Sequence, residues 1–184
     1  MKGLKTAVVS AIALGSVAAP AAAQQWNGAY VGGAVGLSGG GFNYNANYGD
    51  FNGGNAQLFA GYNMPFGNLV AGGELAVTLG QVVTSDTNNT YLKTLADLKL
   101  RLGTTYGSTL VYALVGYSAG TSFAYGGDNN FHGLNYGVGL DYGVNDRMFV
   151  GAELLARNIV DDSGLGYLDT RPMTTLSIRA GLRF

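Results

Sequence analysis

The chain has 184 residues, a length that allows one domain at most, and a formal net charge of −1. It has no cysteine, so it holds neither a disulfide nor a thiolate metal site. The net charge argues against nucleic acid as a partner, because nucleic acid favours a basic surface. Glycine (31 residues) and tyrosine (12 residues) are abundant, 47% of residues are hydrophobic and only 11% are charged. Disordered chains lack so many aromatic and aliphatic residues, so the composition favours a narrow β-barrel, whose crowded interior suits glycine.

The N-terminal segment has the pattern of a secretory signal peptide. Lys2 and Lys5 form a short basic start, residues 6–19 are apolar, and small residues precede a predicted cleavage between Ala23 and Gln24. The apolar run is too short to cross a bilayer as a helix. We therefore expect residues 1–23 to be removed and residues 24–184 to form an exported barrel domain. This domain has 8 basic and 11 acidic residues and a formal charge of −3.

Eight later segments alternate between apolar residues and small, polar or charged residues, which is the period of a β-strand. The predicted strands are residues 29–38, 55–64, 69–80, 92–106, 110–119, 132–143, 148–157 and 174–184. In the fourth, Leu98, Leu100 and Leu102 would point to different sides of a helix, so only a strand fits. The fifth carries no charge and its parity is ambiguous. The residues that we place outward in it are Val111, Ala113, Val115 and Tyr117.

The connections between these segments alternate in length. Residues 65–68, 106–109 and 144–147 are predicted tight turns, whereas residues 39–54, 81–91, 120–131 and 158–173 are longer and rich in Gly, Asn, Asp and Ser. Short turns at one end and long loops at the other are typical of an antiparallel up-and-down outer-membrane barrel. An even strand number places both termini at the short-turn end, which we expect to be periplasmic. Pro20, Pro65 and Pro172 are expected outside the strands, because proline cannot donate to a ladder.

The inward or outward direction of the apolar face separates two kinds of barrel. A soluble lipocalin-like barrel has the same period with its apolar face inside. Here every strand charge lies opposite the aliphatic parity, and these predicted lumen charges are Glu74, Lys93, Asp97, Lys99, Arg101, Asp141, Glu153, Arg157, Arg179 and Arg183. The apolar parity also ends in aromatic residues at the short-turn end, a predicted periplasmic girdle of Tyr62, Tyr106, Tyr142 and Phe184. The sequence therefore predicts a transmembrane barrel with an apolar outer face.

An eight-stranded lumen is only wide enough for side chains to fill, so charges inside it should pair. We expect Glu153 to pair with Arg179, and Glu74 with Lys99 or Arg101. Such a cluster could act as a gate or selectivity ring, or as a plug that fixes the shape of the barrel. The narrow lumen favours the plug.

Catalysis and metal binding have weak support in the sequence. The one histidine, His132, lies near Ser118, Ser122 and Asp128, but no nucleophile motif accompanies this Ser/His/Asp set. The acidic residues of the long loops are Asp50, Asp86, Asp128, Asp161, Asp162 and Asp169. They could hold divalent cations, but they lack the spacing of a calcium loop, so we favour solvated loops. We predict no enzyme, cofactor or metal site.

Three stretches resemble the porin-family and opacity-protein-like small outer-membrane barrels of alphaproteobacteria. They are WNGAYVGGAVGLSGG (26–40), YGVGLDYGVNDRMFVGAELL (136–155) and SIRAGLRF (177–184). The resemblance implies an eight-stranded barrel of the Gram-negative outer membrane, in contact with outer-membrane lipid and lipopolysaccharide. It also implies insertion by the barrel-assembly machinery, which reads the last strand and its terminal Phe184. In contrast to larger relatives, no periplasmic peptidoglycan-binding domain is expected after Phe184.

Members of this family are surface antigens, envelope-stabilising proteins, adhesins and, in some cases, haem binders. The expected function is therefore a structural role in envelope integrity. A small pore for passive diffusion, or an adhesin or haem-binding receptor that acts through the extracellular loops, is the alternative. Neither a ligand nor an oligomeric state is predicted.

Overall fold

The computed structural model describes residues 21–44, 47–79, 91–124, 127–161 and 173–184. One helical turn, α1 (Ala21–Gln24), precedes eight strands. The strands are β1 (Gly28–Tyr44), β2 (Asn47–Phe66), β3 (Leu69–Leu79), β4 (Tyr91–Tyr106), β5 (Thr109–Ala124), β6 (Gly127–Gly143), β7 (Met148–Asp161) and β8 (Met173–Arg183). In these described ranges, no helix combines the length and the apolar character that a membrane crossing requires.

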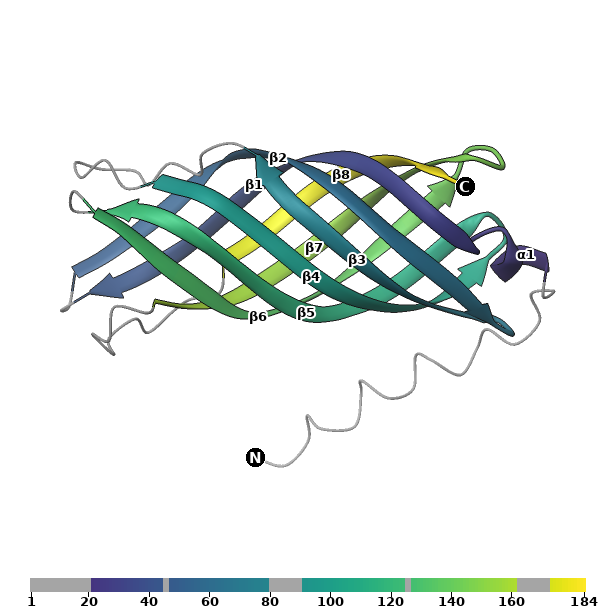
Figure 1. Ribbon diagram of the computed structural model, residues 1–184, viewed down its shortest axis with the longest axis horizontal. Helices are drawn as coiled ribbons and strands as arrows, with labels where there is room; N and C mark the ends of the chain where they lie inside the picture. The colour runs from purple at the N-terminus through teal and green to yellow at the C-terminus, as the bar shows by residue number, and fades with distance from the viewer. Residues whose placement is uncertain (1–20, 45–46, 80–90, 125–126, 162–172) are drawn as a thin grey trace, which may run out of the picture.

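The strands form one closed antiparallel barrel in chain order, and β8 pairs with β1 to complete the cylinder. The predicted fold class is therefore confirmed. Figure 1 shows the tilted strands, with α1, the short turns and the C-terminus at the same end. At this short-turn end, the amide of Phe184 donates to the carbonyl of Ala29 (2.9 Å). Gly67 and Gly107 lie in the two tightest turns at positive φ (62° and 57°), a conformation that glycine adopts without strain.

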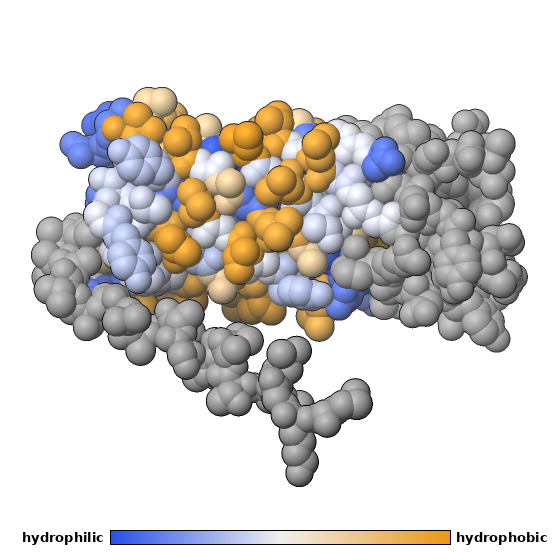
Figure 2. All heavy atoms as spheres, turned by 180° about the vertical axis from the view of Figure 1, so that it is seen from behind, coloured by the Kyte–Doolittle hydropathy of each residue, from blue (hydrophilic) through white to orange (hydrophobic). Residues whose placement is uncertain are grey.

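The two faces of the wall differ sharply in exposure. Leu98, Leu100 and Ile178 are 60%, 65% and 69% exposed, whereas the alternate residues Asp97 and Lys99 are almost completely buried. The outward residues predicted for the fifth strand are all exposed, so that assignment is confirmed. Apolar side chains accordingly gather on the outer wall in Figure 2. The core of this protein is its lumen, and its largest apolar surface faces outward.

All the strands except β3 and β8 are longer than the sequence pattern predicted. β1 and β2 pair continuously to Tyr44 and Asn47, and β5 and β6 pair to Ala124 and Gly127. Much of the predicted loops 39–54 and 120–131 is therefore hairpin. The alternation of apolar residues ends where the outer face is no longer apolar, but the backbone ladder continues through glycine and asparagine. The strand ends predicted from periodicity alone therefore fall short of the observed ends. Of the predicted loop 81–91, residue 91 belongs to β4 and the other residues lie outside the described part. Of the predicted loop 158–173, residues 158–161 belong to β7 and residue 173 to β8, and the other residues lie outside the described part.

Pro65 corrects a second prediction, because it lies inside β2 and pairs with Val70 of β3. β1 pairs with β2 only as far as Asn63, so the other edge of β2 has no partner at Pro65 and needs no amide donor there. Pro20 and Pro172 lie outside the described residues.

A closed cylinder of ladder hydrogen bonds should survive in detergent until it is heated. We expect the unboiled protein to migrate differently from the boiled protein in a denaturing gel of the outer-membrane fraction. Identical migration, with the protein recovered in the soluble periplasmic fraction, would contradict a barrel with an apolar outer face.

Candidate functional site: the barrel lumen

The centre of the lumen holds a group of ionised side chains, here named the charge cluster. Its members come from five strands and are Glu74, Lys99, Arg101, Asp141, Glu153 and Arg179. All six are buried, with at most 4% exposure. Three are anions and three are cations, so the cluster is formally neutral. Neutrality matters because transfer of a lone ion from water into a dry interior costs several kcal/mol.

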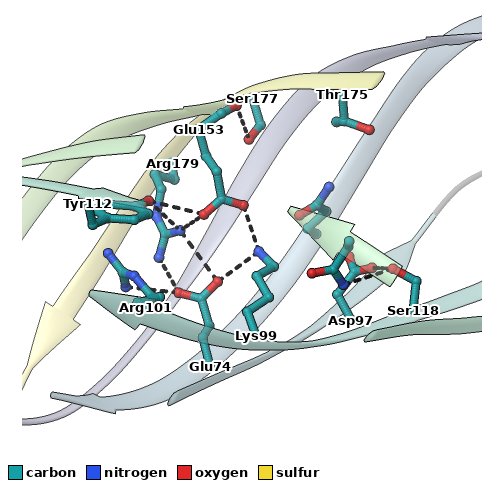
Figure 3. A network of polar contacts seen from close by, with 12 residues as sticks. Glu74, Asp97, Lys99, Arg101, Tyr112, Ser118, Glu153, Thr175, Ser177 and Arg179 are labelled. Atoms are coloured by element: carbon teal, nitrogen blue, oxygen red, sulfur yellow. Dashed lines mark hydrogen bonds and ion pairs between the residues drawn. The ribbon is translucent and has the colours of Figure 1, made fainter. Parts of the chain in front are cut away.

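Glu74 is the most connected anion of the cluster. Its carboxylate accepts from Lys99 Nζ at 2.9 Å, from Arg101 Nη1 at 3.1 Å and from Arg179 Nη2 at 2.5 Å. Figure 3 shows these side chains converging on one point inside the barrel. Removal of the Glu74 charge would leave three cations against two anions.

Glu153 holds the cluster together from the opposite wall. It accepts from Lys99 Nζ at 2.6 Å and from Arg179 Nη1 at 2.7 Å. The expected ion pair of Glu153 with Arg179 is therefore present. Glu74, which was expected to pair with Lys99 or Arg101, pairs with both. Lys99 bridges the two glutamates, which the sequence did not indicate.

Two tyrosines that were not predicted as site residues complete the cluster. The hydroxyl of Tyr30 donates to Glu74 Oε2 (2.9 Å) and accepts from Arg101 Nη1 (2.7 Å). The hydroxyl of Tyr112 donates to Glu153 Oε2 (3.0 Å), and its ring lies 3.7 Å from the guanidinium carbon of Arg101. The parity of both residues pointed inward, so a search of the charged parity for phenols would have found them.

A second polar group, here named the Arg157 network, lies farther from the short-turn end. Arg157 donates twice to Asp97, at 2.9 and 2.7 Å, and once to Thr175 at 2.7 Å. Ser118 donates to Asp97 (2.7 Å) and accepts from Asn135 (2.9 Å). This network is neutral as well, because one carboxylate faces one guanidinium.

The Arg157 network continues around the wall through uncharged side chains. Thr175 and Ser38 share a hydrogen bond of 2.8 Å, Asn55 donates to Ser38 at 2.6 Å, and Gln57 donates to Asn55 at 3.2 Å. The circuit therefore joins seven of the eight strands at one height. Such a circuit ties distant strands together in addition to the backbone ladder.

Apolar layers lie beyond the polar groups at both ends. An aromatic layer of Trp26, Tyr30, Phe59 and Phe149 occupies the short-turn end, with ring centroids 6.0–6.2 Å apart. An apolar cap of buried side chains occupies the other end, formed by Leu95, Phe131 and Met173 with Ile159 packed against them. The ionised groups therefore lie between two apolar layers.

Arg183 differs from the other predicted lumen charges that the structure describes. Its guanidinium lies 4.4 Å from the centre of the Trp26 ring and donates to the carbonyl oxygens of Gln25 (2.8 Å) and Asn145 (2.6 Å). Its hydrogen-bond acceptors are thus backbone groups at the barrel mouth. The side chain of Lys93 lies outside the described residues.

The Ser/His/Asp set considered in the sequence analysis is not assembled around Ser118. Ser118 points into the lumen, whereas His132 lies on the outer parity and stacks on Tyr117, with ring centroids 5.9 Å apart. The two side chains are therefore on opposite sides of the wall. The side chain of Ser122 lies outside the described residues, and the described residues contain no cluster with the ligands of a metal site.

The remaining predicted sites lie at the short-turn end. Tyr62, Tyr106, Tyr142 and Phe184 are 50–77% exposed. Ala23 is buried and Gln24 is exposed. Cleavage between these two residues stays a prediction, as does the signal peptide, whose residues 1–20 lie outside the described part.

Apolar residues outside and paired charges inside define a transmembrane β-barrel, since lipid accepts the former and a sealed lumen accepts the latter. Residues 9–184 match the family described as the outer membrane protein beta-barrel domain. The chain belongs to this family and is an outer-membrane protein of the Gram-negative type. No curated protein matches the chain.

Solved structures share the fold at low sequence identity. The chain is similar to Ail, the attachment invasion locus protein of Yersinia pestis, in complex with the heparin analogue sucrose octasulfate. That match has 16% identity, a TM-score of 0.56 and coverage of 85% of this chain and 99% of that chain. Neisserial surface protein A matches at 13% identity and a TM-score of 0.52, over 86% of this chain and 100% of that one. The alphaproteobacterial source implied by the resemblance stays a prediction.

The charge cluster gives a test of stability. We expect Glu74→Gln to lower the free energy of unfolding by about 3 kcal/mol, because breaking a buried pair leaves uncompensated charge. Urea titration of the protein in lipid vesicles measures this change. Glu74→Gln with Lys99→Met restores neutrality and should recover part of the loss. Asp146→Asn, in an exposed turn, is the control and should stay within about 0.5 kcal/mol. Equal stability of Glu74→Gln and the wild type would contradict the account of the cluster.

Proposed function

We propose that the protein is a non-enzymatic outer-membrane surface protein with a structural role in envelope integrity. The observation that supports this role most directly is the filled lumen. Its described charges pair with one another or bond to backbone carbonyls, between an aromatic layer and an apolar cap. The lumen is then a plug that fixes the barrel shape.

The small-pore alternative needs a continuous path for water along the lumen. The six members of the charge cluster are at most 4% exposed, and each forms an ion pair with another member. To open such a path, the barrel would have to break several of these contacts together. The gate reading is therefore less favoured than the plug.

A binding role has one specific observation in its favour. The β1–β2 and β5–β6 hairpins extend well beyond the last outward leucines of the wall, and these strand pairs lie on opposite sides of the barrel. The structural neighbour Ail is named for attachment and invasion. An adhesin or haem-binding receptor that uses these hairpins is the second candidate function.

The proposed orientation places both termini in the periplasm and the long hairpins at the cell surface. The proposed partners are outer-membrane lipid, lipopolysaccharide and the barrel-assembly machinery, which would read β8 and Phe184. The exposed aromatic residues at the short-turn end are typical of a membrane interface.

A structural role predicts that the envelope depends on the folded barrel and tolerates neutral changes inside it. We expect deletion of the gene to increase the sensitivity of cells to detergent, and the wild-type gene to restore resistance. The paired variant Lys99→Met with Glu153→Gln removes one cation and one anion, and should restore resistance to the same extent. If deletion slows uptake of small solutes but leaves detergent resistance unchanged, the structural role is wrong and the pore is favoured.

A further inference from the structure

On the outer wall, polar residues replace apolar ones at a defined distance from the short-turn end, and this level is here named the polar margin. On β6, Tyr142 and His132 share the outer parity and are ten residues apart. Ten residues of a strand tilted by about 40° rise roughly 25 Å, which is the height of the apolar band of a membrane barrel. The same interval separates Met148 from Asn158 and Phe184 from Thr174. His132 therefore lies where the hydrocarbon ends and the headgroups begin.

Polar side chains concentrate at this margin on β4–β7 in neighbouring groups, separated on β5 by the exposed Ala119, and together they are here named the polar patch. Its members are Thr94, Tyr117, Thr121, Asn130, His132 and Asn158, all exposed or partly exposed.

Neighbouring strands place these side chains together. Thr121 is the register partner of both Thr94 and Asn130, and its hydroxyl donates to the Asn130 amide oxygen at 3.4 Å. His132 stacks on Tyr117, with ring planes 25° apart. Asn158 lies diagonally across from His132 on β7.

The charge around the polar patch indicates whether the patch suits the phosphate or the sugar of a lipid headgroup. Among the described side chains, Arg147 is the one cation outside the lumen, and it lies in the turn at the opposite end. Asp128, on the same face as His132 and beyond it, adds negative charge. None of the six members of the polar patch is Lys or Arg, the residues with which proteins bind phosphate. Hydroxyl, amide and imidazole groups beside an aromatic ring instead suit an uncharged ligand rich in hydroxyls.

We propose that the polar patch binds the sugar hydroxyls of the outer-leaflet glycolipid, next to the acyl chains that cover Tyr117 and the leucines below it. The proposal rests on the orientation given under the proposed function, because only the outer leaflet presents sugars at this height. It assigns a binding role to His132 that does not involve catalysis. It also explains why aliphatic residues give way to amides and hydroxyls at one level of the wall.

The test compares variants that keep the shape of the patch but remove its hydrogen bonds. Tyr117→Phe with His132→Phe keeps two aromatic rings and removes the phenol hydroxyl and the imidazole nitrogens. Asn52→Leu is the matched control, since Asn52 is an exposed residue on β2, on the opposite wall, ten residues from Tyr62. Each protein is refolded in detergent, checked for its heat-dependent gel shift, and titrated with rough lipopolysaccharide or phosphatidylglycerol. Bound lipid is counted by native mass spectrometry.

We expect the paired variant to bind lipopolysaccharide about fivefold or more weakly, since it loses at least two hydrogen bonds. Binding of phosphatidylglycerol should not change, and Asn52→Leu should behave as wild type. The proposal is overturned if the paired variant binds lipopolysaccharide normally, if both lipids weaken equally, or if Asn52→Leu loses as much.

The orientation of the barrel in the membrane is measured separately. The chain has no native cysteine, so an introduced cysteine is its one site for labelling by maleimide. Asp128→Cys should react with an impermeant maleimide in intact cells, whereas Asp146→Cys should react only after lysis. The reverse labelling would place the patch at the phospholipid leaflet and would overturn the glycolipid proposal. The same labelling leaves the filled lumen of the proposed function untouched, so the two failures are distinguishable.

Discussion

Closure of eight strands into one cylinder is the constraint on which the rest of the structure depends. A membrane offers no water to backbone amides and carbonyls, so every strand must have two partners and the sheet must close. Eight strands leave an interior that side chains fill completely. Each inward residue is therefore a core residue, and each outward residue within the apolar band faces lipid. The fold exchanges the usual places of apolar and ionised side chains.

The ionised side chains of the lumen also favour one strand register over its alternatives. A shift of one residue in the register of any strand would move its inward side chains to the outer face. Such a shift in β4 would place Asp97, Lys99 and Arg101 in lipid and three leucines among the ions of the lumen. Because the charge cluster and the Arg157 network are each neutral, the native register satisfies these groups internally. Paired charges in the lumen thus oppose alternative registers, which is a role that an apolar filling could not have.

The sequence predicted those features that alternation controls. Eight strands, the closed antiparallel order, the outward parity of β5 and the pairing of Glu74 and Glu153 with cations all follow from which residues share a face. The bridging by Lys99 and the phenol contacts of Tyr30 and Tyr112 depend on how long side chains reach across the lumen, which sequence spacing does not contain. The hairpin extensions and the strand position of Pro65 depend on backbone pairing, which continues where apolar alternation has ended.

The central claim is a closed lumen filled by two neutral groups of ions, and single-channel recording tests its closure most directly. The purified protein, shown to be folded by its heat-dependent gel shift, is inserted into planar lipid bilayers in concentrated salt. We expect the current to stay at the level of the protein-free membrane over long recordings. Discrete conductance steps that recur with one amplitude, and that change in Glu74→Gln, would contradict the account and would identify the charge cluster as a gate.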